Sequence, residues 1–276
     1  MALAYDTEPV ASTDRPSLSS AANMLVRWLA PIAGLAIVLA LWWIAGLAIE
    51  ANPRLSAFQG FTVEQTLPSL VDLLTSGAAW EASVPSLVRI GEGLFWAFVI
   101  GTPVGLAIGS FRLLESMLQV PFQILRMVSP LAWMPIAVLV FATWDGAIVF
   151  LITAAAIWPI VFSTAAGVKR IDPVWLAMAD NLGGSRVAVM RTVVLPAVER
   201  DILSGLRLAL GVAWIVLVPA EYLGVTSGLG YAINDARDTL SYDRLAALVL
   251  LIGFIGFVLD SVIAVAIRRA HWVPTA

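Results

Sequence analysis

The sequence predicts an all-α membrane protein with six transmembrane helices, on the evidence of composition, apolar run length and charge distribution. The chain has 276 residues, of which 60% are hydrophobic and 13% are charged, and its mean hydropathy is +0.92. A soluble domain carries about 25% charged residues, so this chain lacks the polar side chains to cover a globular surface. Its apolar residues also fall in runs of about 20, the length of helix that crosses about 30 Å of hydrocarbon.

Each apolar run is long enough to span a bilayer when its flanks are included. The first four runs contain no charged residue, the fifth carries Arg207 and Glu221 near its ends, and the sixth contains Asp260. The predicted spans are 29–49, 93–110, 127–144, 146–168, 203–224 and 245–267.

The distribution of lysine and arginine predicts the orientation. If the N-terminus is cytoplasmic, twelve of the 16 basic residues lie on inner segments and helix ends, and four lie outside. Inner loops of membrane proteins are enriched in basic residues, so both termini are expected in the cytoplasm. The inner group is Arg15, Arg27, Arg112, Arg126, Lys169, Arg170, Arg186, Arg191, Arg200, Arg207, Arg268 and Arg269, and the outer group is Arg54, Arg89, Arg237 and Arg244.

The chain is expected to divide into a disordered cytoplasmic tail, 1–23, and a transmembrane domain, 24–276. The tail is rich in Ser, Thr, Pro and Asp and has no apolar period. The domain has an outer loop, 50–85, in which 62–74 is predicted to form a short amphipathic helix at the membrane interface. It also has a long cytoplasmic loop, 169–200.

Several classes of function are excluded by residue content. The formal net charge of −3 argues against a nucleic-acid partner, which requires clustered basic residues. The chain has no cysteine, so disulfides and thiolate metal sites are absent, and its single histidine, His271, cannot form a histidine cluster. There is no G-x-x-x-x-G-K-[ST] motif, and Lys169 is the only lysine, so ATP is not bound here by that motif.

The cytoplasmic loop contains residues that typically begin and end helices, and they predict two short helices. Asp172 suits an N-cap and Pro173 the first helical position, and Gly183-Gly184 ends the helix. Ser185 suits the cap of a second helix, which Pro196 is expected to end. The first helix has one apolar stripe and the second has basic residues: Val174, Trp175, Met178, Ala179 and Leu182 on the first, Arg186 and Arg191 on the second. This stripe needs a surface to cover it, which is either a partner protein or the membrane and the chain's own bundle.

Prolines and charges inside the spans mark candidates for a translocation pathway. Pro121, Pro130 and Pro135 each remove a backbone donor, and such breaks persist at membrane depth only where protein or a cavity satisfies the freed carbonyls. Ser129 and Trp133 are therefore predicted either to line a pathway or to belong to a kinked packing helix. For Trp158-Pro159 the packing interpretation is favoured.

The charges are more easily explained as ion pairs. Arg89 and Glu92 have the spacing of a helical pair, and Glu221 is expected to pair with Arg89 or Arg237. Asp260 is expected to pack or pair near the inner end of the last span. The row Gly101, Gly105 and Gly109 allows close helix approach, inside the subunit or across a dimer.

The loop and the region after it resemble the permeases of binding-protein-dependent ABC transporters. Ala179, Leu182, Gly183, Gly184 and Ser185, followed by Val193, Leu195 and Pro196, resemble the EAA loop of that family. The resemblance covers most of the chain after about Pro85. It continues through 205–209, Trp214, 220–222, 228–231, 252–256 and Asp260. The acidic residue that names the loop would fall at Ala177, which is not acidic.

This resemblance implies a type I ABC importer permease in the bacterial cytoplasmic (inner) membrane, which is not itself an enzyme. It implies a second permease copy, two cytoplasmic ATPase subunits that bind ATP and Mg²⁺, and a periplasmic or lipid-anchored substrate-binding protein. No cofactor is expected in this chain. The coupling residues would be Asp172, Val174, Trp175, Met178, Ala179, Leu182, Gly183, Ser185, Arg186, Leu195 and Pro196. The pathway residues would be Ser129, Pro130, Trp133, Trp158, Trp214 and Glu221.

Two segments bear on the substrate. Residues 128–136 and 157–160 resemble the nitrate, bicarbonate and cyanate permeases more than the taurine and alkanesulfonate permeases, so a small inorganic oxyanion is expected first and an organosulfonate second. A proton-coupled secondary transporter using Glu92, Glu221 or Asp260 is the alternative from another class. Such a protein would usually show inverted repeats, and no convincing repeat is present.

Overall fold

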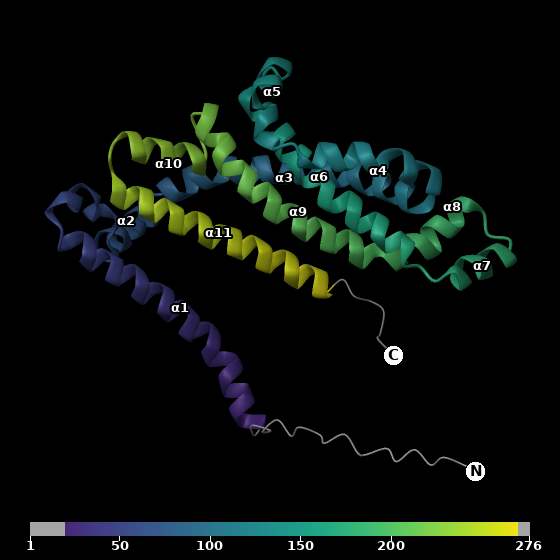
Figure 1. The fold of residues 1–276 in the computed structure, drawn as a ribbon, viewed down its shortest axis with the longest axis horizontal. Coiled ribbons are helices and arrows are strands. Elements are labelled where there is room, and N and C mark those ends of the chain that lie inside the picture. Colours follow the sequence, from purple (N-terminus) through teal and green to yellow (C-terminus); the bar gives the residue numbers. More distant parts are fainter. Residues whose placement is uncertain (1–19, 270–276) are drawn as a thin grey trace, which may run out of the picture. The chain divides into compact units, whose positions relative to one another are not determined.

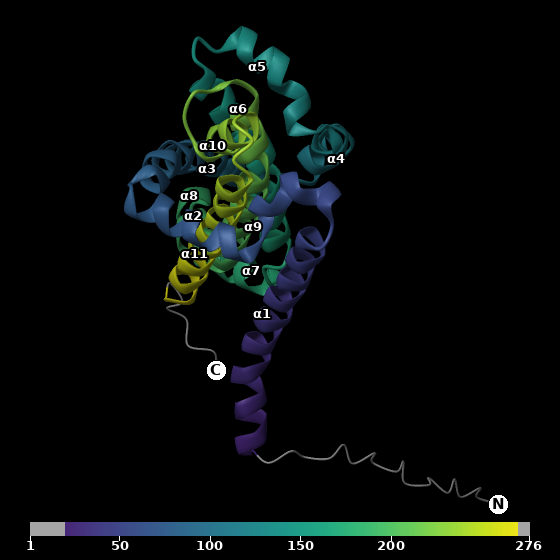
Figure 2. The same ribbon diagram turned by 90° about the vertical axis from the view of Figure 1, so that its left-hand side faces the viewer.

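The computed structural model describes residues 20–269, with side chains from Leu29 onward, and every regular element in this range is helical. The predicted disordered tail lies mostly outside the described residues, as does His271. The chain divides into two compact units, Met1–Val63 and Glu64–Ala276. Figures 1 and 2 show the elements of each unit.

The first unit contains one long helix and a short 3-10 helix. Helix α1 (Ser20–Glu50) includes an apolar stretch, Leu29–Glu50, which agrees with the predicted first span. The 3-10 helix η1 (Pro53–Phe61) begins at Asn52, whose Oδ1 accepts from the Arg54 N–H at 3.0 Å. Trp42 Nε1 donates to the Phe61 carbonyl at 2.8 Å, and this bond holds the end of η1 against α1.

The second unit is built around three long helices. They are α3 (Ala78–Ser110), α6 (Trp144–Lys169) and α9 (Leu195–Gly224), which lie side by side (Figure 1). Their shared core holds Ile148, Leu151, Ile160 and Leu217, all fully buried. The other elements are α2 (Val63–Thr75), α4 (Arg112–Met127), η2 (Pro130–Trp133), α5 (Met134–Val140), α7 (Pro173–Asn181), α8 (Arg186–Val189), α10 (Leu229–Asp238) and α11 (Tyr242–Arg269).

The predicted glycine row packs within the subunit, where α3 contacts α6. A Cβ added at Gly105 would lie 2.7 Å from both the Val161 carbonyl oxygen and the Thr164 Cβ. At Gly101 the nearest atoms belong to Ile157 and Ile160. Small residues at such contacts let two helix backbones approach closely. The row therefore explains how α3 and α6 form the centre of the bundle.

Replacing Gly105 with alanine is expected to destabilise the protein by about 1–3 kcal/mol, as overpacking does, because the added methyl group meets the α6 backbone. Thermal unfolding of the purified protein in detergent measures the change. Gly91→Ala is the matched control on the same helix, since an added Cβ there has nothing within 4 Å. An unchanged Tm for Gly105→Ala would contradict the packing described here.

Charged contacts define the two ends of this unit. At one end, here called the Lys169 end, Lys169 pairs with Glu115 at 2.5 Å and Arg170 pairs with Asp201. At the other, the Asp145 end, Arg89 of α3 pairs with Asp145 of α6 at 2.6 Å. Helices α7 and α8 lie at the Lys169 end, and α10 lies at the Asp145 end (Figure 1). The loop between α6 and α9 is thus separated from α10 by the length of the bundle.

The third predicted span, 127–144, is wrong in its bounds. The helix starts at Arg112 and ends at Met127, and after a bend of 87° the chain continues as η2 and α5. Val128 is extended, and Ser129 also lies outside the helical region, with a ψ of 128°, because a residue directly before proline avoids that region. The described residues thus contain five straight candidate spans, or six if the bent pair Arg112–Met127 and Pro130–Val140 counts as one.

The prediction that Pro196 ends a helix is also wrong. Helix α8 passes through a π-helical turn, Met190–Val194, directly into α9, so that Arg186–Gly224 forms one long helical segment. The Leu195 N–H donates to the Met190 carbonyl, five residues back. A proline ring clashes with the carbonyl four residues before it, and the wider π turn accommodates Pro196 without ending the helix.

The other elements agree with the sequence more closely. The helices α6 and α11 match the predicted fourth and sixth spans, while α3 and α9 begin earlier than predicted. Helix α2 confirms the predicted amphipathic helix, and its Leu73 packs with Leu229 and Leu248 of α10 and α11. The segment after Gly228 forms α10.

Candidate functional site

The candidate coupling helix is α7, whose caps were predicted correctly. Asp172 is its N-cap, and its Oδ1 accepts from the Val174 N–H at 2.9 Å. Pro173 occupies the first position. Gly183 follows the helix with a left-handed φ of 73°, the conformation typical of a residue that ends a helix. These contacts are local in sequence, which is why they could be recognised without a tertiary structure.

The predicted stripe of α7 is almost entirely uncovered. Val174, Trp175 and Met178 are between 55% and 58% exposed, and Leu182 is 85% exposed. Ala179 is half-buried. The opposite side of the helix is anchored by Leu176, which packs beside Ile171, Val194 and Val198 at the Lys169 end. The helix therefore presents an apolar surface while a separate residue fixes it to the bundle.

The remaining predicted coupling residues lie between α7 and α9. Ser185 caps α8, since its Oγ accepts from the Ala188 N–H at 3.3 Å, and Arg186 is exposed. Leu195 and Pro196 begin α9. They line a shallow cavity of about 360 Å³ with Phe98, Arg191, Glu199, Ile202 and Leu203.

The predicted pathway residues do not gather at one place. Ser129 and Pro130 lie at the break after α4, and Trp133 packs partly against the central core. Trp158 makes an edge-to-face contact with the Phe122 ring of α4 at a centroid distance of 5.3 Å. Trp214 packs against α11, where its Nε1 would lie 2.8 Å from a Cβ at Gly256. Glu221 lies at the Asp145 end.

Glu221 is fully buried and forms an ion pair with Arg89, as predicted. Arg89 Nη1 donates to Glu221 Oε1 at 2.5 Å, and Arg89 Nε donates to Asp145 Oδ1 at 2.7 Å. The side chain of Arg89 is 5% exposed, while that of Asp145 is 67% exposed. Buried charges persist when they are paired and hydrogen-bonded. Arg89 meets this requirement with two carboxylates, one buried and one in contact with solvent.

Hydrogen bonds extend this ion pair to the start of α10. Ser86 Oγ lies 2.8 Å from both Glu221 carboxylate oxygens, and it accepts from the Leu229 N–H at 2.9 Å. The Gly230 N–H donates to Glu221 Oε2 at 2.9 Å. Gly228 has a left-handed φ of 110°, and a Cβ there would lie 2.5 Å from the carboxylate. The network therefore joins α3, α6, α9 and α10 at one buried point.

Some of the other predicted ion pairs differ from those that the structure contains. Arg89 does not pair with Glu92, which is exposed and has no ion-pair partner among residues 29–269, so that predicted pair is wrong. Arg237 pairs with Asp238 and lies over the Tyr222 ring. Asp260 pairs with Arg207 through two hydrogen bonds of 2.7 and 2.6 Å, which confirms its predicted pairing role.

One basic residue lies at an unexpected depth. Arg126 was predicted among the inner basic residues, but it occupies the last turn of α4, well away from the Lys169 end. Its guanidinium carbon lies 5.0 Å from the centre of the Phe162 ring. The prediction failed because it started the third span at Met127, fifteen residues after the helix begins.

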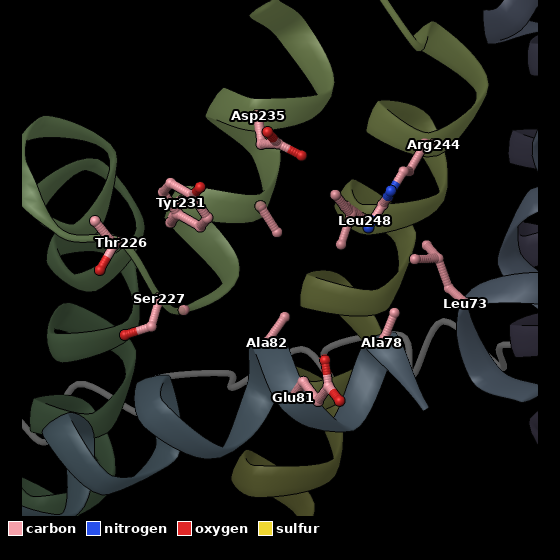
Figure 3. Close-up of a pocket in the computed structure, with 12 residues that line it drawn as sticks. Leu73, Ala78, Glu81, Ala82, Thr226, Ser227, Tyr231, Asp235, Arg244 and Leu248 are labelled. Atoms are coloured by element: carbon pink, nitrogen blue, oxygen red, sulfur yellow. The ribbon is translucent and has the colours of Figure 1, made fainter. Parts of the chain in front are cut away.

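A polar cavity opens near the Asp145 end. Its volume is about 310 Å³, and it lies between α2, α3, α10 and α11. Figure 3 shows Glu81 of α3 on one side, and Asp235 of α10 and Arg244 of α11 on the other. Tyr231 and Ser227 also line it. Within the described residues no group of three His, Cys, Asp or Glu side chains could hold a metal ion.

Comparison with known proteins agrees with this arrangement. Residues 98–272 match the family model described as binding-protein-dependent transport system inner membrane component. The chain is 35% identical over 243 residues to the bicarbonate transport system permease protein CmpB of Synechococcus elongatus. The aligned region covers 86% of this chain and 87% of that relative. It is 33% identical over 234 residues to the taurine transport system permease protein TauC of Escherichia coli, covering 83% and 84%.

The name of a third relative gives a different substrate. The nitrate import permease protein NrtB of Leptolyngbya laminosa is 34% identical over 193 residues, covering 70% of this chain and 69% of the relative. The matched regions include the broken third span and α7. With its apolar helices, the chain is a multi-pass inner-membrane protein and not an enzyme, as the sequence predicted. It belongs to the family of permease subunits of binding-protein-dependent ABC transporters, in the branch of the nitrate, bicarbonate and taurine permeases.

Proposed function

We propose that this chain pairs with a second copy of itself to form the translocation pathway of an ATP-driven importer for a small anion. The observation that carries this proposal is the uncovered apolar stripe of α7, which stands at the Lys169 end while Leu176 on the other side of the helix packs against the bundle. An apolar surface on a short capped helix outside the spans is suited to docking in a groove of a partner protein.

The orientation follows from the basic residues at the two ends. Lys169, Arg170, Arg186 and Arg191 all belong to the Lys169 end or to the loop beyond it. Without Arg126, the inner group still contains more basic residues than the outer group. The positive-inside rule therefore supports an orientation with α7 in the cytoplasm and α10 outside. This orientation makes α7 accessible to an ATPase and α10 accessible to a substrate-binding protein.

The ATPase subunits would bind ATP and Mg²⁺, and this chain would bind neither. Closure of two ATPases on ATP would move the two copies of α7. Because α7 is connected through the π-helical turn to α9, that movement would be transmitted to the core helices and would alternate the pathway between its two open forms. Family membership favours this mechanism over the proton-coupled alternative.

The substrate we propose is an inorganic oxyanion such as nitrate or bicarbonate. The bicarbonate and nitrate relatives support this choice, together with the resemblance of residues 128–136 and 157–160. Taurine or an alkanesulfonate is the second candidate, favoured by the taurine relative of similar identity. All of these substrates contain an anionic group in which several oxygen atoms share the negative charge.

Reconstitution in proteoliposomes with the cognate ATPase and binding protein tests the proposal. Uptake of labelled nitrate, bicarbonate or taurine should require ATP and the binding protein and should persist with a protonophore. Calorimetry on the binding protein should identify the same anion. Uptake that continues without ATP and collapses with the protonophore would support the proton-coupled alternative instead.

A further inference from the structure

We propose that Arg126 binds the transported anion half-way across the membrane, at the end of a hydrated polar stripe on α4. This inference deepens the proposed function by assigning a substrate-contacting residue. Four observations carry it: the depth of Arg126, its lack of a counter-ion, the polar face of α4 that leads to it, and the helix break beside it.

The depth follows from the packing of α4 along α6. Glu115 contacts Lys169 near the end of α6, while Phe122 contacts Trp158, so the two helices run antiparallel. Figure 2 views α4 nearly along its axis, with α5 crossing the view. Arg126 lies eleven residues beyond Glu115, or about 16 Å along the helix. The backbone of Arg126 therefore lies about half of the 30 Å hydrocarbon thickness from Glu115, and its guanidinium lies at the level of Phe162, seven residues before Lys169 on α6 and about 10 Å from it along that helix.

Arg126 differs from Arg89 and Arg207, the other arginines inside the spans, because it has no carboxylate partner in the part of the chain whose side chains the structure describes. Arg89 pairs with Glu221 and Asp145, and Arg207 pairs with Asp260. Within the described residues, the contact recorded for Arg126 is the Phe162 ring. An arginine at this depth faces a water-filled cavity or the bundle interior rather than lipid. Its five N–H donors therefore need acceptors that the single chain does not provide.

An aromatic group holds the guanidinium by its face. Phe162 lies under Arg126, and Trp158 lies between Phe162 and Phe122, with ring centroids 6.3 and 5.3 Å away, respectively. A cation over an aromatic face is held without a hydrogen bond, so the N–H groups of the guanidinium remain available as donors. The edges of the planar group carry paired donors that match two oxygens of an oxyanion. The arrangement is suited to a small planar anion such as nitrate or bicarbonate.

A polar stripe on α4 connects Arg126 to the Lys169 end. At 100° per residue, one side of this helix collects the polar residues, and the other sides are apolar. Most of the stripe is exposed, and Glu115 is half-buried. A polar stripe that runs through the depth of the membrane requires water or protein beside it. Its members are Arg112, Glu115, Ser116, Gln119, Gln123 and Arg126.

The stripe ends where the helix breaks. After Met127 the chain turns by 87°, and Ser129 is exposed at the turn. Non-helical backbone is tolerated at membrane depth where it lines a cavity. The break therefore supplies a hydroxyl donor close to Arg126 in sequence and stops the polar stripe at mid-depth. This is the position at which an alternating-access carrier must hold its substrate.

Because the chain has no cysteine, single introduced cysteines can test whether the polar stripe of α4 is hydrated and whether a positive charge lies beside it. Single variants Gln123→Cys, on the stripe, and Ile124→Cys, on the exposed apolar side of α4, are made in the assembled transporter. Membrane-impermeant thiol reagents should label Gln123→Cys and leave Ile124→Cys unreacted. An anionic reagent should react about tenfold faster than a cationic one of equal size, by electrostatic attraction. Adding Arg126→Gln should remove this preference.

Transport by Arg126 variants gives the second measurement. Arg126→Gln should lower ATP-driven anion uptake by about ten- to a hundredfold, as expected for losing a hydrogen bond to a charged group. Stimulation of the ATPase by the binding protein should persist, because α7 is untouched. Arg126→Lys should retain part of the uptake. Arg268→Gln, a control at an exposed arginine in the last turn of α11 and outside the stripe, should transport at nearly the normal rate.

The outcomes separate this proposal from the function on which it rests. Equal labelling at Gln123 and Ile124, no charge preference, or normal uptake by Arg126→Gln would overturn the role of Arg126. Protection of the stripe from both reagents by the second copy would overturn it too, and would assign α4 to the dimer contact. If labelling behaves as expected but the wild type shows no ATP-dependent uptake, the anion site stands and the ATP-driven function fails.

Discussion

Aspartate at both Met178 and Leu182 is expected to abolish ATP-driven uptake while the protein still inserts and assembles as a folded subunit. The two side chains are 58% and 85% exposed, so the exchange costs little folding energy. Burying a side chain of this size contributes about 1.5–3 kcal/mol to docking. Losing two of them weakens the contact by about two to four orders of magnitude, and an unpaired carboxylate in an apolar groove weakens it further.

The measurement compares ATP hydrolysis and uptake in proteoliposomes. Hydrolysis should no longer respond to the binding protein, and either single variant should show a smaller loss of coupling. Ala177→Asp is the matched control, because Ala177 is exposed on α7 away from the stripe and occupies the position where the family resemblance places an acidic residue. Normal coupling in the double variant, with an unchanged Tm, would contradict docking through this surface.

Replacing Glu221 with alanine is expected to destabilise the protein by about 3–5 kcal/mol, the cost of leaving a buried charge without its partner. Glu221 accepts hydrogen bonds from Arg89, Ser86 and the Gly230 N–H, so its removal also releases the start of α10. Thermal unfolding in detergent, followed by size-exclusion chromatography, measures the loss. The damage should appear as a lower Tm and a smaller yield of monodisperse protein.

Two companion variants test the explanation by charge burial. Asp145→Asn should lower the Tm much less, because the Asp145 side chain is 67% exposed and water can replace its role. Converting both buried partners, Arg89→Met with Glu221→Met, should be milder than Glu221→Ala because no uncompensated buried charge remains. If the double variant loses as much stability as the Arg89→Met and Glu221→Met single variants lose together, charge pairing does not stabilise the Asp145 end.

Elements whose signals are local were predicted well. The caps of α7 depend on residues two or three positions apart, and the span of α6 depends only on an uninterrupted apolar run. The bounds of the third span were not predicted, because α4 mixes glutamine, glutamate and arginine with apolar residues and therefore has low hydropathy. A helical-wheel reading of residues 112–127 would have revealed its amphipathic pattern.

The partners of the buried charges illustrate the opposite case. Arg89 and Glu221 are separated by 132 residues, while Arg89 and Glu92 are separated by three. Helical spacing favoured the local pair, yet Glu92 points away from the centre and stays exposed. The choice between them depends on which faces of α3 and α9 meet in the bundle, where the glycine row of α3 packs on α6.

The sequence by itself determined that the protein is a helical membrane protein with a short capped helix between its spans that carries an apolar stripe. Run length, capping residues and apolar period are properties of neighbouring residues, and they act before any tertiary contact exists. Only the tertiary structure decided that Arg89 joins Glu221 and Asp145, and that Arg126 lies over the Phe162 ring with no carboxylate partner among residues 29–269. Both results depend on the register between helices, which is set by side-chain packing over long sequence separations.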